Sequence, residues 1–248
     1  MPLTLIDTLN LLAIFTAGLV RGYAGFGFAA ISIGLISLWR SPSDLVPIIF
    51  LLEIPASLLM LRSALRDFSW VWIKPLIGGS IIGIPIGVGL LASISTAWLQ
   101  LMVGATICTA STLVRLGWHP QQTDSKGFRW LTGLVSGVLN GLSALGGIVC
   151  AVMLYSAQVQ PKVWRATLTL LFLFTDVYAL ALAYWSGLIQ SHTWSTALVW
   201  SVPLALGIFA GSRVFHGSNL DKFRDRVFLI LIGLGITGLV KAVWTLLS

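Results

Sequence analysis

The chain is a series of long apolar segments separated by short polar loops, and this pattern dominates its 248 residues. Hydrophobic residues make up 57% of the sequence and charged residues only 9%, against roughly 25% charged residues in an average soluble domain. A helix that crosses a bilayer needs about 20 apolar residues, and most of the segments approach that length. We therefore predict an all-α, polytopic membrane protein. The apolar segments occupy residues 3–20, 27–39, 45–62, 75–92, 97–114, 130–142, 145–157, 166–185, 193–210 and 227–246.

The lysine and arginine residues predict how these segments are oriented. When the segments are threaded through a membrane in order, thirteen of the 15 basic residues lie in loops on one side, and only Arg40 and Lys241 lie on the other. Because cytoplasmic loops carry the excess of Lys and Arg, we expect the basic loops in the cytoplasm, both termini outside it, and an inner-membrane location. The basic loops hold Arg21, Arg62, Arg66, Lys74, Arg115, Lys126, Arg129, Lys162, Arg165, Arg213, Lys222, Arg224 and Arg226.

The remaining composition argues against cofactors and nucleic acid. The net charge of +7 comes from short loops beside apolar segments, which orientation in the bilayer explains without a nucleic-acid partner. Cys108 and Cys150 lie within apolar segments and have no metal-ligand spacing. A Gly-x-Gly-x-x-Gly run at Gly233, Gly235 and Gly238 follows no strand, so we interpret it as helix packing. We expect no cofactor and no metal, and we expect the N-terminal segment to be retained because no basic stretch precedes it.

Two halves of the chain share features in the same order. A Gly-Leu-Val-x-Gly run occurs at residues 18–22 and again at 133–137. A glycine-rich break follows each run, at residues 24–28 and 143–147, and a short apolar stretch then leads to a proline. The common order indicates an internal repeat. Further matches are Pro42 with Pro161, Gly83 with Gly207, and Gly87 with Gly211.

The charges predict that the two halves cross the membrane in opposite directions. In the first half the loop before the Gly83 segment is basic and residues 93–96 after it carry no Lys or Arg, whereas in the second half residues 187–193 carry none and the stretch after Gly211 is basic. This reversal is the inverted-repeat plan of many secondary transporters. We expect a first repeat over residues 1–116, a cytoplasmic linker over 117–128, and an inverted second repeat over 129–248.

One segment is too short to cross a bilayer alone. Residues 27–39 would form a helix of about 20 Å, against a hydrocarbon core of roughly 30 Å. We interpret it as a half-helix that forms a re-entrant hairpin with the preceding segment. Such a hairpin leaves the sidedness of the loops unchanged, and the number of transmembrane or re-entrant helices stays open between about 8 and 10.

The two glycine-rich breaks are the best candidates for a substrate site. Glycine lets the backbone leave helical geometry, and irregular backbone at membrane depth occurs where it lines a cavity or is buried in protein. A new helix begins after each break, so two positively polarised helix N-termini converge, which favours an anion. Arg21 adds a planar donor fork suited to carboxylate, sulfonate or sulfite oxygens. The candidate substrate-binding residues are Arg21, Gly22, Gly25, Phe26, Gly27, Phe28, Asn140, Gly141, Ser143, Gly146 and Gly147.

Alternative interpretations apply to these residues. In the alternative interpretation, the Arg21 side chain snorkels to the cytoplasmic face and only helps to set the topology. Glycines four residues apart are more typical of helix-packing surfaces than of ligand loops, and we apply this interpretation to those outside the candidate site segments 21–28 and 140–147. The glycines with this spacing are Gly18, Gly22, Gly79, Gly83, Gly87, Gly133, Gly137 and Gly141.

Glu53 and Asp176 interrupt apolar runs. Acids within membrane segments are energetically costly and are usually paired or part of a proton path. Apolar surroundings favour the protonated form of a carboxyl group, so both residues are candidates for proton coupling. A structural hydrogen bond to a neighbouring helix is the alternative for each.

The two glycine-rich breaks, each followed by a short helix and a proline, resemble the TauE/SafE family, also called the sulfite exporter or toluene sulfonate uptake permease family. The resemblance covers essentially the whole chain, including the stretch from Gly207 to Arg213. It implies transport of small sulfur-containing anions and sometimes other organic acids, with a role for the break glycines Gly25, Gly27, Gly146 and Gly147. The chain departs from the run of three glycines common in the family's first motif, because Phe26 and Phe28 place aromatic rings beside the break.

We predict a secondary transporter, not an enzyme, that moves sulfite, a sulfonate or a sulfo-organic acid across the inner membrane by alternating access. No ATP-binding Gly-x-x-x-x-Gly-Lys-Ser/Thr motif is present, so a gradient would drive transport. A passive anion channel and a carrier of another small organic acid stay open, and a homodimer is compatible with the sequence. An intramembrane hydrolase with Ser143 as nucleophile and His192 as base is less favoured, because the two residues fall at different membrane depths.

Overall fold

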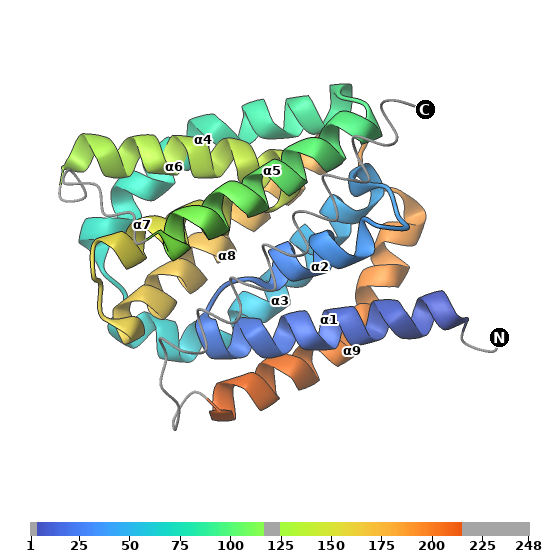
Figure 1. Cartoon of the computed structure of the whole chain (residues 1–248), viewed down its shortest axis with the longest axis horizontal. Helices are drawn as coiled ribbons and strands as arrows, with labels where there is room; N and C mark the ends of the chain where they lie inside the picture. Colours follow the sequence, from blue (N-terminus) through green and yellow to red (C-terminus); the bar gives the residue numbers. More distant parts are fainter. Residues whose placement is uncertain (1–3, 117–124, 215–248) are drawn as a thin grey trace.

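The computed structural model describes residues 4–116 and 125–214, and all its regular structure there is helical. Five of the helices are long and apolar enough to cross a membrane, namely α1, α3, α4, α8 and α9. The prediction of an all-α polytopic membrane protein is therefore confirmed. The helices, shown in Figure 1, are α1 (Leu5–Ala24), α2 (Phe28–Ile36), α3 (Pro42–Asp67), α4 (Trp70–Ser93), α5 (Thr96–Arg115), α6 (Lys126–Ser143), α7 (Gly146–Ser156), α8 (Pro161–Trp185) and α9 (Ser191–Val214).

Some of the predicted features lie outside the described residues. These are the apolar segment 227–246 with its Gly233, Gly235 and Gly238, the basic residues from Lys222 to Lys241, and residues 117–124 of the predicted linker. The other nine apolar segments each coincide with a helix.

Two helices are much shorter than the others, and each follows one of the breaks. Helix α2 has 9 residues and α7 has 11, which correspond to about 14 and 17 Å of helix. Neither length spans a hydrocarbon core of roughly 30 Å. The half-helix expected after the first break thus has a counterpart after the second.

Glycines allow two pairs of helices to pack with their backbones in contact. A Cβ atom on Gly83 of α4 would lie 2.8 Å from the Val138 backbone nitrogen of α6, and one on Gly18 of α1 would lie 2.7 Å from the Leu204 carbonyl oxygen of α9. Further along the second pair, Gly22 meets the backbone of Ile208. Small residues permit such close approach between membrane helices. The interpretation of the regularly spaced glycines as helix-packing surfaces is confirmed.

The contacts also give the relative directions of the helices. In each contacting pair the residue numbers increase in the same direction along both helices. Helix α1 therefore runs parallel to α9, and α4 runs parallel to α6. Helices α3 and α8 run antiparallel, since the Ser69 backbone N–H, just after α3, donates to Thr167 near the start of α8 at 3.2 Å. Figure 1 shows that α1 and α6 begin at opposite ends of the bundle.

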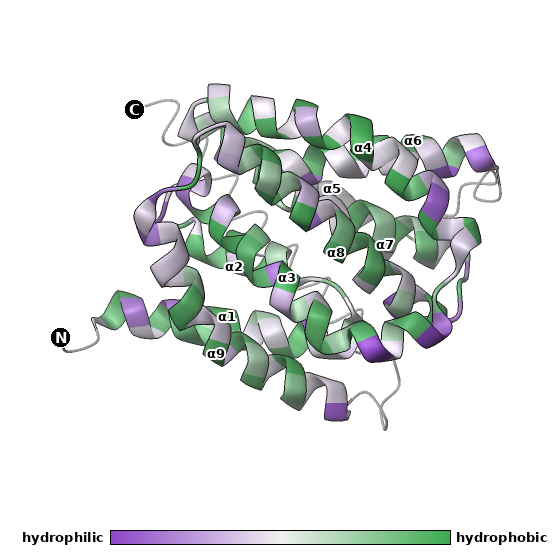
Figure 2. Cartoon of the chain, turned by 180° about the vertical axis from the view of Figure 1, so that it is seen from behind, coloured by the Kyte–Doolittle hydropathy of each residue, from purple (hydrophilic) through white to green (hydrophobic). Residues whose placement is uncertain are grey.

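The outer surface of the bundle suits a lipid environment. Figure 2 shows hydrophobic residues along the sides of the helices and hydrophilic residues mainly at the ends of the bundle. On α9 alone, Leu198, Val202, Leu206 and Phe209 are each more than half exposed. In a water-soluble monomer a contiguous apolar surface of this kind is rare, whereas in a bilayer it faces acyl chains.

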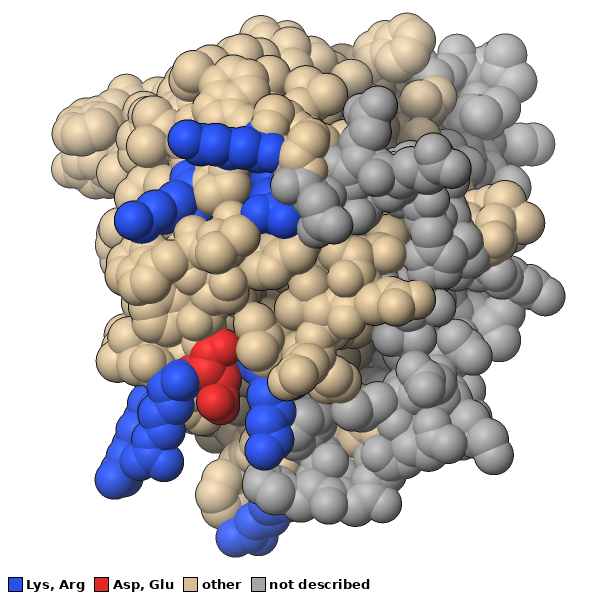
Figure 3. All heavy atoms as spheres, turned by 90° about the vertical axis from the view of Figure 1, so that its left-hand side faces the viewer, with Lys and Arg blue, Asp and Glu red and all other residues tan. Residues whose placement is uncertain are grey.

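Basic side chains gather at one end of the bundle. Figure 3 views the end where α6 and α8 begin, and Lys and Arg side chains are prominent on it with little acidic surface between them. A one-sided distribution of Lys and Arg is the feature that orients membrane proteins.

Candidate substrate site

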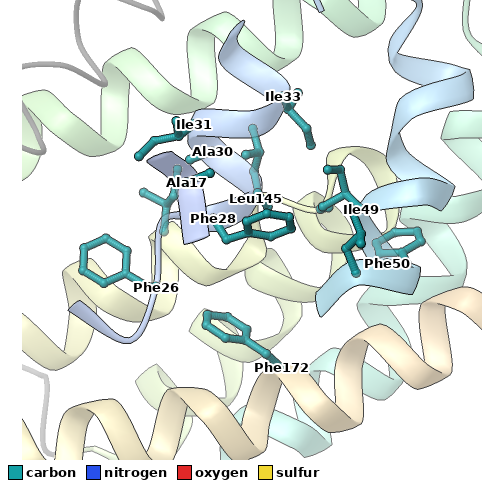
Figure 4. Packing of buried hydrophobic residues seen from close by; sticks show 14 of the residues in the cluster. Ala17, Phe26, Phe28, Ala30, Ile31, Ile33, Ile49, Phe50, Leu145 and Phe172 are labelled. Atoms are coloured by element: carbon teal, nitrogen blue, oxygen red, sulfur yellow. The ribbon is translucent and has the colours of Figure 1, made fainter. Parts of the chain in front are cut away.

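The two breaks meet in the buried interior of the bundle. Figure 4 shows Phe26 and Phe28 of the first break, Leu145 of the second, and Phe172 of α8 within one cluster of buried side chains. The predicted convergence of the breaks is therefore a feature of the fold. The geometry of each break explains how the chain reaches this centre.

In the first break, glycine is required by the backbone conformation. Gly25 ends α1 with φ +80° and donates its N–H to the Arg21 carbonyl at 2.8 Å, and Gly27 precedes α2 with φ +94°. Both values lie in the left-handed region, where a side chain is strained. The N-cap residue Gly27 has no side chain to bind the first N–H groups of α2, so partners elsewhere in the protein must satisfy them.

In the second break, glycine is required by packing. Here Ala144, with φ +56°, takes the left-handed conformation. Gly146 lies against the Ser136 carbonyl, and Gly147 lies against the edge of the Phe172 ring, so a Cβ atom at either position would meet these neighbours. The expectation that glycine supplies backbone freedom holds at the first break, whereas close approach explains the glycines of the second.

A small cavity lies where the breaks meet. It has room for about one water molecule. A sulfite or sulfonate group is larger than water, so this conformation has to open before such an anion enters. The cavity is lined by Gly27, Ala29 and Ala30 from the first half-helix, by Ala144, Leu145, Gly147 and Ile148 from the second, and by Glu53, Asn140, Phe172 and Asp176.

Arg21 is fully buried beside this cavity. Its Nη1 donates to the Gly25 carbonyl at 2.6 Å and its Nη2 donates to Ser57 at 3.0 Å. The guanidinium carbon lies 4.4 Å from the centre of the Phe172 ring, within the range of a cation–π contact. The alternative in which Arg21 snorkels to the membrane surface is wrong, because its side chain points into the protein.

Glu53 is the counter-ion of Arg21. Its Oε2 lies 3.1 Å from Arg21 Nη2, and both side chains are buried. The same carboxyl group accepts a hydrogen bond from the backbone of Ala29 in the first turn of α2. A carboxylate therefore already lies between a guanidinium group and a helix N-terminus, the two features that favour an anion.

Asp176 and Asn140 form a second buried pair on the other half of the chain. Asn140 Nδ2 donates to Asp176 Oδ1 at 2.9 Å, and both residues line the central cavity. Burying a carboxyl group requires a donor of this kind, and a neutral amide supplies one without a charge. Both acids that the sequence singled out thus lie at the same cavity.

The other predicted site residues lie around this centre without lining it. Gly22 packs against the backbone of Ile208, and Gly141 packs against Ile84. Phe26 stacks on Trp164 with ring centres 5.7 Å apart. Ser143 donates to the Leu139 carbonyl of its own helix. Phe28 is completely buried in the surrounding hydrophobic core, and Gly25 contacts Arg165.

The hydrolase interpretation has no geometric basis. Ser143 is buried, with its hydroxyl group bonded within α6, whereas His192 is partly exposed in the first turn of α9. A serine nucleophile needs its base within hydrogen-bond reach.

Three residues at or near the centre had not been singled out as site residues. Ser57 lies one helical turn after Glu53, so the i, i+4 spacing on α3 was the available signal. Phe172 resembled an ordinary core aromatic residue. Arg165, which the sequence places in a basic loop, lies in the second turn of α8. Its Nη2 donates to the Gly22 carbonyl at 2.7 Å.

Comparison with known proteins gives consistent results. A family model described as sulfite exporter TauE/SafE matches residues 10–238. The probable sulfite/organosulfonate exporter TauE of Cupriavidus necator is 24% identical over 251 residues, which cover 98% of each chain. The probable inner membrane transporter protein TsaS of Comamonas testosteroni is 26% identical over 207 residues, 79% of this chain and 83% of that protein. No solved structure matches the chain significantly.

Proposed function

Because the chain belongs to the sulfite exporter TauE/SafE family, we propose that it is a secondary transporter for a small sulfur-containing anion, sulfite or an organosulfonate. It is a multi-pass membrane protein, and we place it in the inner membrane. The relative from Cupriavidus necator is named for sulfite and organosulfonate export, and the one from Comamonas testosteroni for an inner-membrane location. Both names support the proposal at low sequence identity.

The observation that carries the proposal is the position of the Glu53 carboxylate. It contacts Arg21 at 3.1 Å and the N-terminal turn of α2, in a cavity where both half-helices begin. Sulfite and sulfonate oxygens would make the same contacts as this carboxylate. The substrate would therefore replace Glu53 as the partner of Arg21.

This exchange links anion binding to protonation. A proton that binds a Glu53 carboxylate oxygen removes its negative charge, so Arg21 loses its counter-ion and becomes available to the substrate. The substrate then supplies the negative charge that a buried arginine requires. Asp176, held by Asn140, is the second carboxyl group at the cavity and the second candidate for carrying a proton.

Alternating access requires two halves that exchange roles. We propose that residues 1–116 and 129–248 are inverted repeats on either side of a linker at 117–128, with the basic end of the bundle and the linker in the cytoplasm and both termini outside. The opposite directions of α3 and α8 and the starts of α1 and α6 at opposite ends support this arrangement. The gathering of Lys and Arg at one end supports its orientation.

The test is counterflow in proteoliposomes that contain the purified protein. A carrier takes up labelled sulfite or methanesulfonate faster when the lumen holds unlabelled substrate, whereas a passive channel shows no such stimulation. Exchange that responds to small carboxylates but to no sulfur anion would identify a carrier of other organic acids.

The variant for this test is Arg21→Gln combined with Glu53→Gln, which removes both charges of the buried pair together. We expect it to lose exchange. Arg40→Gln is the matched control, because Arg40 lies outside the central site and contacts the Trp200 ring instead. Wild-type exchange by the double variant would remove Arg21 from the substrate site.

A further inference from the structure

A second, much larger cavity lies between α3, α8 and α9. Its volume is about 810 Å³, and it is formed where α3 and α9 end and α8 begins, toward the end of the bundle shown in Figure 3. A cavity of this size lies within the range of small-molecule sites in proteins. It is separate from the small central cavity and shares no lining residue with it.

The charged residues of this cavity favour an anion. Lys162 and Arg165 of α8 and Arg213 of α9 line it, and Asp67 of α3 is the acid among the lining residues. Lys162 and Arg213 are exposed, whereas Arg165 is partly buried at the inner side of the cavity. Three cations against one acid give the cavity a positive potential, which raises the local concentration of anions.

The rest of the cavity wall is apolar. Leu59 and Met60 of α3 and Leu206 and Phe209 of α9 contribute most of this surface. A binding site that combines cations with a large apolar wall suits a ligand that carries an anionic group on a hydrophobic body. An aromatic or alkyl sulfonate has this chemistry, whereas sulfite has no hydrophobic part.

Arg165 connects this cavity to the central site. A Cβ atom on Gly25 would lie 2.8 Å from Arg165 Cγ, and Arg165 Nη2 donates to the Gly22 carbonyl. The charges of Arg165 and Arg21 are close enough to act on each other. The backbone from Gly22 to Gly25 therefore lies between Arg165, at the large cavity, and Arg21, at the central site.

We propose that the large cavity is a second anion site, an entrance vestibule that binds organosulfonates before they reach Arg21. The inference rests on the proposed function for its direction of travel, but binding in the vestibule requires no transport. Lys162 and Arg213 attract the sulfonate group, the apolar wall holds its hydrophobic body, and Arg165 is the cation nearest the next site. Sulfite, lacking the hydrophobic body, binds there more weakly than benzenesulfonate.

Thiol modification tests the vestibule without measuring transport. Ser212 lines the cavity, so Ser212→Cys is introduced into protein in which Cys108 and Cys150 are replaced by alanine, and the protein is placed in phosphatidylcholine nanodiscs. Modification rates are compared for the anionic 2-sulfonatoethyl and the cationic 2-(trimethylammonium)ethyl methanethiosulfonates. We expect the anionic reagent to be favoured, and Lys162→Gln with Arg213→Gln to lower the rate ratio about tenfold, the lower limit of electrostatic steering.

The matched control is Lys74→Gln with Lys126→Gln, which removes two lysines that do not line the cavity. It should leave the ratio nearly unchanged. Benzenesulfonate should protect Ser212→Cys from modification at lower concentrations than sulfate does, and the Lys162/Arg213 variant should lose this protection. Sulfate is used as the small anion without a hydrophobic body, because sulfite itself reacts with thiosulfonates. An unchanged ratio in that variant, or equal protection by both anions, would overturn the proposal.

A lipid phosphate is the other anion that such a cavity could attract. Nanodiscs with phosphatidylglycerol distinguish this source, because a lipid headgroup would protect Ser212→Cys without added sulfonate. That result would contradict the vestibule as a substrate site and leave the central site untouched. Conversely, protection by benzenesulfonate in a protein that shows no counterflow would retain the vestibule and refute the transporter.

Discussion

Asn140 occupies in the second half of the chain the position that Arg21 occupies in the first. The carbonyl of each accepts the N–H of the left-handed residue that ends its helix, Gly25 for Arg21 and Ala144 for Asn140. Each side chain then donates to a residue 36 positions further on, Arg21 to Ser57 and Asn140 to Asp176. The two hydrogen bonds correspond, with the ionisable side chain as the donor in one half and as the acceptor in the other.

This correspondence shifts the sequence match of the two halves by one helical turn. The Gly-Leu-Val-x-Gly runs at 18–22 and 133–137 would pair Arg21 with Ser136. In the structure Gly22 meets Ile208 of α9, and its counterpart that meets Ile84 of α4 is Gly141 rather than Gly137. Regularly spaced glycines repeat within each helix, so sequence comparison alone does not distinguish neighbouring turns.

The buried pair of Arg21 and Glu53 should show strong energetic coupling. Arg21→Gln leaves Glu53 without its counter-ion, so we expect it to destabilise the protein by about 3–5 kcal/mol. Adding Glu53→Gln should recover much of that loss, because both buried charges are then absent. Denaturant titration of the detergent-solubilised protein measures the three variants, and strictly additive effects would contradict the pairing.

The pair of Asn140 and Asp176 allows the positions of amide and acid to be exchanged. Asn140→Asp combined with Asp176→Asn should keep one amide-to-carboxyl hydrogen bond and hence near-wild-type stability. Asp176→Leu alone leaves the Asn140 amide unsatisfied, at about 1–3 kcal/mol. If proton coupling requires the carboxyl group to be at position 176 on α8, the exchanged variant should fold but lose proton-dependent counterflow. Full activity in that variant would show that the carboxyl group works equally well on α6.

The glycines of α4 should differ sharply in their tolerance of alanine. Gly83→Ala places a methyl group 2.8 Å from the Val138 backbone nitrogen, so α4 and α6 must separate, at about 1–3 kcal/mol. Gly89→Ala on the same helix meets nothing within 4 Å and should be neutral or stabilising. Thermal unfolding of the two purified variants is the measurement, and equal midpoints would contradict the close packing of α4 on α6.

A similar comparison isolates the role of the first break. Gly25 and Gly187 both have positive φ, so alanine costs about 1–2 kcal/mol at either position. At Gly25 the new methyl group also lies 3.1 Å from Arg165 Cα, whereas at Gly187 it meets nothing within 4 Å. We therefore expect Gly25→Ala to lower counterflow while Gly187→Ala preserves it. Loss of activity in both variants would assign the effect to backbone strain in general.

The proposed orientation predicts which loops face the outside of the cell. In a chain without Cys108 and Cys150, Ser191→Cys should react with a membrane-impermeant maleimide on intact cells, whereas Arg66→Cys should react in inside-out vesicles. Both residues are exposed at the ends of helices. Labelling of both positions from the same side would show that the two halves run in the same direction.

The helices and the fold class followed from local properties of the chain. The length of the apolar runs and the charges between them predict segments at residues 45–62 and 75–92, and the helices α3 and α4 extend one to five residues beyond these bounds. Arg21, Glu53, Asn140 and Asp176 were also recognisable, because a polar or charged group in an apolar run is costly and needs a partner.

The partners themselves depend on tertiary contacts. Nothing in the local sequence indicates that Arg21 pairs with Glu53 and Ser57, or that Gly147 is required by the ring of Phe172. The membrane explains why the sequence reveals the buried charges but not their partners. Its apolar interior acts on each segment separately, so the amino-acid sequence alone reveals which segments are buried and which charges are costly. Which groups satisfy those charges depends on how distant helices pack together, and that is decided only in the folded bundle.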